Sequence, residues 1–128
     1  MKALIYILLP LLSFFGVFTV ITTKSGCGDF RVHQTRSDFG VIISHLDAYK
    51  MLNGNYPTQE QGLIALVQRP ETESIPKEWV PAYREEPRDG WGNRYLYRFP
   101  GSKDPKEPEI ISLSLDGVVS EDDMLSQD

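Results

Sequence analysis

A long stretch without charge near the N-terminus divides the chain into two chemically different parts. Residues 3–23 contain no Asp, Glu, Lys or Arg, whereas the residues that follow contain many. In a helix, which rises ~1.5 Å per residue, such a stretch is about 30 Å long, the thickness of the hydrocarbon core of a bilayer. The sequence therefore predicts that residues 1–24 are a membrane anchor or a signal segment. The rest, about 100 residues, is enough for one domain with a modest core.

The residues around Cys27 leave the type of attachment open. An uncleaved anchor explains the length of the apolar stretch, because the apolar region of a secretory signal peptide has only about 7–15 residues. A lipid anchor is an alternative, since the small residues Ser25 and Gly26 precede Cys27 as in a bacterial lipobox. Lys24, however, stands where that motif has an aliphatic residue. Cys27 is therefore a candidate for lipid attachment or an inert thiol in a linker.

The charge of the chain excludes some classes of partner. The formal net charge is -5 over 128 residues, and Lys2 is the only charged residue before the apolar stretch. Nucleic acids and anionic membrane surfaces attract clustered Lys and Arg, so we expect no nucleic acid as a partner of this acidic chain. The single cysteine excludes an internal disulfide, so the domain depends on core packing or on a metal.

The sequence lacks the patterns of known catalytic sites. Its two histidines are His33 and His45, and His45 has no Cys or second His at ligand spacing. We find no Ser/His/Asp set, no HExxH and no glycine-rich phosphate loop. Acidic residues are abundant, but nothing places two of them in an apolar pocket. The sequence thus predicts a protein that is not an enzyme.

The spacing of apolar residues predicts one long helix. Gly26 and Gly28 disfavour a helix directly after the apolar stretch, so we expect residues 25–34 to be a flexible linker. From about Thr35, apolar residues recur at i, i+3, i+4, i+7 and i+10, which places them on one helical face. They are Phe39, Ile42, Ile43, Leu46 and Tyr49. Asn53-Gly54 is a typical helix stop.

The remaining segments predict a short helix and a small sheet. Thr58 and Gln61 fit a capping box, which indicates the start of a short helix. Residues 69–90 contain four prolines, which exclude long regular structure there. A two-residue period over residues 95–99 and an apolar run over residues 110–115 each predict a strand. Together these elements indicate the α+β class.

Four segments in this order resemble the general secretion pathway protein G family (GspG), the major pseudopilin of type II secretion. They are DAYKMLNGNYPT (47–58), EQGLIAL (60–66), DGWGNRYLY (89–97) and SLSLDG (112–117). The resemblance implies a pilin-like fold over residues 35–128. One long N-terminal helix would pack on a short helix, an irregular loop and a small antiparallel sheet.

The resemblance also implies a function and a location. The chain would be a non-enzymatic structural subunit, or an accessory, of a type II secretion or type IV pilus-like machine that acts in protein export. Its partners would be other pseudopilins or secretion-machine components, with copies of itself among the options. Its domain would lie in the periplasm, held at the bacterial inner membrane. The alternative is a membrane- or lipid-anchored periplasmic binding module that reuses the fold without polymerising.

The N-terminus departs from the pattern of that family. A prepilin leader is short and basic, is cut after a glycine, and leaves a glutamate at the fifth position of the mature chain. The nearest candidate follows Gly16, has no basic leader before it, and places Ile21 at the glutamate position. Assembly into a filament therefore does not follow from a resemblance of the soluble domain.

In the resembled family, the segment after the last strand wraps a calcium ion. Carried over residue by residue, the implied ligands are the carboxylates of Asp116, Asp122 and Asp123 and the main-chain oxygens of Leu113 and Val118. Such oxygens suit the ion, which takes six to eight of them on a flexible loop. The glycine-rich stretch of the family is replaced here by residues 118–121. The alternative is a simple turn followed by a solvated acidic end.

Overall fold

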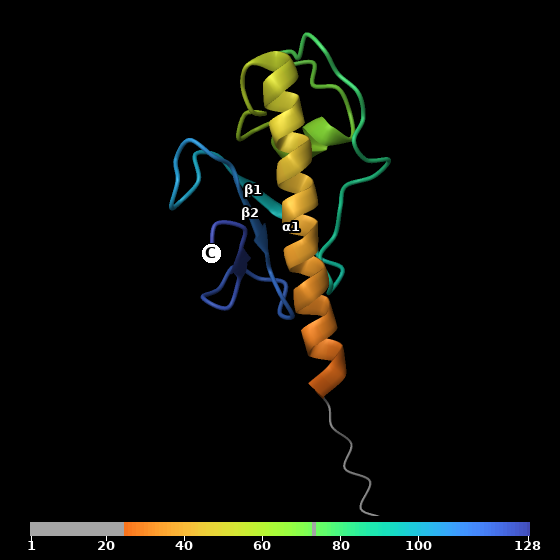
Figure 1. The fold of residues 1–128 in the computed structure, drawn as a ribbon, viewed down its shortest axis with the longest axis vertical. Helices are drawn as coiled ribbons and strands as arrows, with labels where there is room; N and C mark the ends of the chain where they lie inside the picture. Colours follow the sequence, from red (N-terminus) through yellow and green to blue (C-terminus); the bar gives the residue numbers. More distant parts are fainter. Residues whose placement is uncertain (1–24, 73) are drawn as a thin grey trace, which may run out of the picture.

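The computed structural model describes residues 25–72 and 74–128. The long helix α1 (Ser25–Asn53) is followed by a short 3-10 helix, η1 (Gly62–Leu66), and by three strands, β1 (Leu96–Arg98), β2 (Glu109–Ser112) and β3 (Met124–Leu125). Figure 1 shows α1 running along the molecule, with the sheet beside its middle part. The predicted α+β architecture of one long helix, a short helix, an irregular loop and a small sheet is confirmed.

The apolar stripe of α1 forms the centre of the core. Phe39, Ile42, Leu46 and Tyr49 are buried there, and Ile43 is partly buried against the same cluster. These positions lie on one side of the helix, so a single face packs against the sheet and η1. The helix ends as expected: Gly54 has a φ of 85°, and its N–H donates to the carbonyl of Lys50 at 2.7 Å.

The start of α1 differs from the expectation. Residues 25–34 were expected to form a flexible linker before a helix starting near Thr35, but α1 begins at Ser25. At Thr35, where the helix was expected to begin, the buried hydroxyl accepts a hydrogen bond from the N–H of Gly90 at 3.1 Å. Gly90 also lies so close to Arg31 that an added Cβ would sit 2.7 Å from its carbonyl oxygen. Each residue that extends the helix also adds a backbone hydrogen bond, which offsets the ~1 kcal/mol by which Gly26 and Gly28 each destabilise a helix.

The predicted capping box is present, but the helix after it is tighter than expected. The N–H of Thr58 donates to Oε1 of Gln61 at 3.0 Å, and the N–H of Gln61 donates to Oγ1 of Thr58 at 3.2 Å. The next residue, Gly62, has a φ of 54°, which interrupts an α-helical path. The chain therefore continues as the 3-10 helix η1, which buries Leu63, Ala65 and Leu66.

The sheet is antiparallel, with strand order β1-β2-β3. In β1, Tyr97 is buried between two exposed neighbours, as the two-residue period predicted. All four residues of β2 are buried, including Glu109, whose Oε2 is 2.8 Å from Nη1 of Arg98 and whose Oε1 accepts from Ser102 at 2.6 Å. A carboxylate can be buried at this place because both of its oxygens have charged or polar partners.

The third strand was not expected from the sequence. Met124 pairs with Ser112 and Leu125 pairs with Ile111, so the chain after the acidic residues returns to the sheet. Residues 120–123, interpreted in the alternative as a solvated acidic end, therefore lie between two strands rather than at a free end. The predicted strand over residues 110–115 is shorter than expected, because Ser114 turns away with a φ of 53°.

Within residues 25–72 and 74–128, no helix combines the length and the hydropathy needed to cross a membrane. The predicted anchor or signal segment, residues 1–24, lies outside the described residues.

Candidate cation-binding loop and the adjoining cleft

All five predicted calcium ligands lie in one connection. Residues 113–123 join β2 to β3, and the pairing of Ser112 with Met124 closes this loop at its base. The predicted ligands are Leu113, Asp116, Val118, Asp122 and Asp123. They therefore belong to a closed hairpin connection rather than to a loose tail.

Hydrogen bonds within the loop already use several of these oxygens. The carbonyl of Leu113 accepts from the N–H of Gly117 at 3.2 Å, and Oδ1 of Asp116 accepts from the N–H of Val118 at 3.2 Å. Oδ2 of Asp123 accepts from the N–H of Ser120 at 3.1 Å. A carboxylate or carbonyl oxygen has two lone pairs, so each of them retains one acceptor site for a cation.

One oxygen of this loop is buried and unpaired. Oδ1 of Asp123 has no hydrogen-bond partner among the described residues, although it is shielded from solvent. A buried carboxylate oxygen without a donor or a cation is costly, and such atoms are rare in folded proteins. The five predicted ligands of this loop would offer carboxylate and carbonyl oxygens only, and such hard donors suit a calcium ion better than a soft metal.

The side chains alone do not complete a metal site. Asp116 and Asp122 are exposed. In the part of the chain that the structure describes, no group of three or more His, Cys, Asp or Glu side chains could hold a metal ion. Because calcium takes six to eight oxygens, backbone carbonyls and water would have to supply most of the ligands. A calcium site in this loop would therefore have to be largely built from the backbone.

A buried carboxylate next to the loop was missed by the sequence reasoning. Asp89 is 4% exposed. Its Oδ1 accepts from the backbone N–H of Trp91 at 3.0 Å and of Asn93 at 2.8 Å. Its Oδ2 accepts from Oγ of Ser112 at 2.6 Å and from Nδ2 of Asn93 at 3.4 Å. The 89–93 segment was singled out only as part of the DGWGNRYLY motif, and the available signal was an acidic residue closely followed by an amide in a glycine-rich turn.

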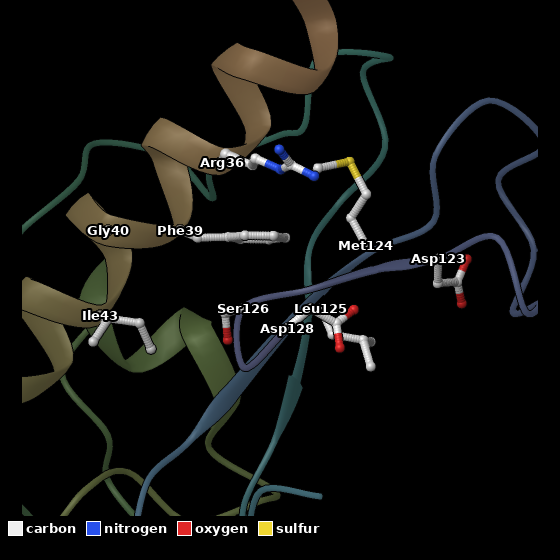
Figure 2. Close-up of a pocket in the computed structure, with 9 residues that line it drawn as sticks. All are labelled: Arg36, Phe39, Gly40, Ile43, Asp123, Met124, Leu125, Ser126 and Asp128. Carbon is white, nitrogen blue, oxygen red and sulfur yellow. The ribbon is translucent and has the colours of Figure 1, made fainter. Parts of the chain in front are cut away.

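An open cleft adjoins the loop on the side of α1. Its volume is about 800 Å³, and Asp123 belongs both to its wall and to the loop. Figure 2 shows Phe39 and Arg36 extending from α1 toward the strand that carries Met124. Asp128 lines the same cleft, and the hydrogen bond that Lys103 donates to it lowers the pKa of its carboxyl group. The cleft is thus partly apolar, with charged groups on both walls.

Cys27 lies near the start of α1, within the range Ser25–Asn53. Its attachment to a lipid stays a prediction.

Comparison with known proteins points to one family. Residues 24–127 match the family model described as type II secretion system (T2SS), protein G. The type II secretion system core protein G of Pseudomonas aeruginosa is 35% identical over 115 residues, which cover 88% of this chain and 80% of the relative. The protein of the same name from Aeromonas hydrophila is 38% identical over 89 residues, covering 68% of this chain and 61% of the relative.

A solved structure agrees with the sequence matches. The crystal structure of the major pseudopilin from the type 2 secretion system of enterohaemorrhagic Escherichia coli superimposes with a TM-score of 0.69 at 35% identity. The match covers 76% of this chain and 86% of that chain. Fold and sequence therefore lead to the same family.

Proposed function

This chain belongs to the type II secretion system protein G family, and we propose that it acts at the bacterial inner membrane with its domain in the periplasm. As a member of that family it is a structural pseudopilin subunit in protein export and not an enzyme. In that position it works with other components of the secretion machinery. The chain reaches the membrane either through residues 1–24 as an uncleaved anchor or through a lipid on Cys27.

The observation that carries this proposal is the position of α1. The helix starts at Ser25, directly after the apolar segment, and extends beyond the sheet toward its N-terminal end in Figure 1. Its central part is fixed to the domain by the buried residues Phe39, Ile42 and Leu46. A rigid helix that leaves the domain at the predicted anchor supports a tethered subunit.

Membrane fractionation of cells that express the full-length chain tests the attachment. The wild type is expected in the membrane pellet after alkaline carbonate extraction, and a C-terminal tag is expected to be cleaved by protease in spheroplasts but not in intact cells. The mass of the purified chain distinguishes the two routes, because a lipid-anchored chain starts at an acylated Cys27, whereas a chain with an uncleaved anchor starts at Met1. Recovery of the wild type in the cytoplasmic fraction would contradict the proposal.

The proposal includes a calcium ion in the 113–123 loop. The carboxylates of Asp116, Asp122 and Asp123 and the main-chain oxygens of Leu113 and Val118 would hold it. The support from the structure is the buried, unpaired Oδ1 of Asp123. When bound, the ion would supply a positive charge to a loop that carries acidic residues and no Lys or Arg, which reduces their mutual repulsion.

Thermal melting of the full-length chain in detergent micelles tests the ion. Calcium is expected to raise the melting temperature by several degrees over EDTA, because a ligand that binds only the folded state stabilises it. Asp123→Asn should reduce this shift strongly. Glu121→Gln is the matched control, since it removes one charge from the same loop at a residue outside the proposed ligand set, and it should retain most of the shift. Equal melting in calcium and EDTA would refute the ion.

A further inference from the structure

Ser114 is the residue where the chain turns from β2 into the loop. It has a φ of 53°, a left-handed conformation that is uncommon for a residue other than glycine. Its N–H donates to Oγ of Ser112 at 3.2 Å, and its carbonyl accepts from Nδ2 of Asn93 at 2.6 Å. Both backbone groups of this unfavourable residue are therefore held by side chains.

The same residue also connects the two ends of the loop. Oγ of Ser114 donates to the carbonyl of Asp122 at 3.1 Å. Asp122 precedes Asp123, the residue with the buried, unpaired oxygen. Whatever fixes Ser114 therefore also restrains the backbone at the far side of the loop.

Asn93 contacts the middle of the loop as well as its start. A Cβ added to Gly117 would lie 3.2 Å from Oδ1 of Asn93, so the glycine allows the backbone to approach this side chain. Gly117 has a φ of 67° and follows Asp116 in the loop. The side chain of Asn93 thus bonds to residue 114 and lies beside residue 117.

Asn93 is itself fixed by a rigid partner. Its backbone N–H and its side-chain amide both donate to the buried carboxylate of Asp89, which also accepts from Ser112. Hydrogen bonds to a buried charged group are stronger than neutral ones, and such a network is ordered when all its members are paired. The network links the 89–93 turn to the end of β2 without involving any of the five proposed ligands.

From these contacts we infer that Asn93 is a positioning residue for the 113–123 loop, holding Ser114 and Gly117 in place before a cation binds. The effect of Asn93 on cation binding rests on the proposed calcium site, whereas its effect on the order of the loop does not. A loop that is ordered in advance loses less conformational entropy on binding, so the cation binds more tightly than it would bind a loop without this support.

The test uses Asn93→Ala and a matched variant in the full-length chain in detergent micelles. Asn53→Ala is the matched variant, because the Asn53 side chain also bridges two segments, by bonds to the carbonyls of Tyr49 and Glu78 and from the N–H of Glu78. Hydrogen exchange of peptides that cover residues 113–123 is measured in EDTA. Calcium affinity is measured separately by isothermal titration with calcium chloride.

In EDTA, Asn93→Ala is expected to exchange about tenfold faster than the wild type in this loop, the effect of losing one hydrogen bond, whereas Asn53→Ala leaves it unchanged. Asn93→Ala should also raise the Kd for calcium by about tenfold, with no change for Asn53→Ala. Equal loop exchange in Asn93→Ala and the wild type, or an equal change of Kd in both variants, would overturn the inference. A wild type that binds no calcium refutes the ion alone, and the exchange in EDTA still decides whether Asn93 orders the loop.

Discussion

Replacement of Asp89 by alanine should destabilise the domain more than any other single change near the loop. Asp89 is 4% exposed, so water cannot easily replace its carboxylate. The change leaves the N–H groups of Trp91 and Asn93 and the hydroxyl of Ser112 without their acceptor. Each buried donor left unpaired costs roughly 1–3 kcal/mol, and Ser112 can rotate to another acceptor, so we expect a total loss of about 3–5 kcal/mol. Domains of this size are stable by about 5–15 kcal/mol.

The assay is a urea titration of the full-length chain in detergent micelles with EDTA present, followed by tryptophan fluorescence. Asp89→Asn should lose less than Asp89→Ala, because an amide oxygen can still accept from the two backbone N–H groups. Asp104→Ala is the control, since its carboxylate accepts one exposed bond, from the N–H of Lys106 at 2.9 Å, and it should cost less than about 1 kcal/mol. A loss of less than about 1 kcal/mol for Asp89→Ala would refute the view that this carboxylate organises the turn and the loop.

A rise in pH and two glycine substitutions probe the packing of the domain. Burial raises the pKa of Tyr56, Tyr95 and Tyr97, so the stability that comes from these neutral phenols should be fully present below the ordinary phenol pKa of about 10 and be lost as the pH rises above it. The phenolate absorbance of the folded chain should therefore appear at higher pH than that of the chain unfolded in urea, and coincident titrations would contradict this. Gly101→Ala should lower the free energy of unfolding by roughly 1–3 kcal/mol in the same urea titration, because its Cβ would lie 2.6 Å from the carbonyl oxygen of Glu107. Gly40→Ala on α1 is the control: its Cβ would meet nothing within 4 Å, so the free energy of unfolding should rise by up to about 1 kcal/mol.

The elements that the sequence predicted well are those with a local cause. The buried face of α1 follows from a 3.6-residue period that Phe39, Leu46 and Tyr49 maintain over several turns. The capping box between Thr58 and Gln61 needs only two residues three positions apart. Such patterns are visible without knowledge of the rest of the fold.

The elements that were missed depend on contacts between distant segments. The two-residue strand β3 exists because Met124 and Leu125 find partners in β2, and so short a strand has no period of its own. The early start of α1 brings Arg31 close to the distant Gly90, and the role of Asp89 depends on Ser112. The loop proposed to hold a cation was chosen because its acidic residues are close together in sequence, whereas its supporting network joins Asp89 and Asn93 to residues that are distant in sequence.

The measurement that tests the central claim most directly is the set of proteins exported by the host bacterium with and without this chain. If the chain is a structural subunit of type II secretion, its deletion should remove a defined group of proteins from the culture supernatant, and these proteins should accumulate in the periplasm. Expression of the full-length wild-type chain should restore their export. An unchanged supernatant and an unchanged periplasm after deletion, measured by quantitative mass spectrometry, would contradict the account.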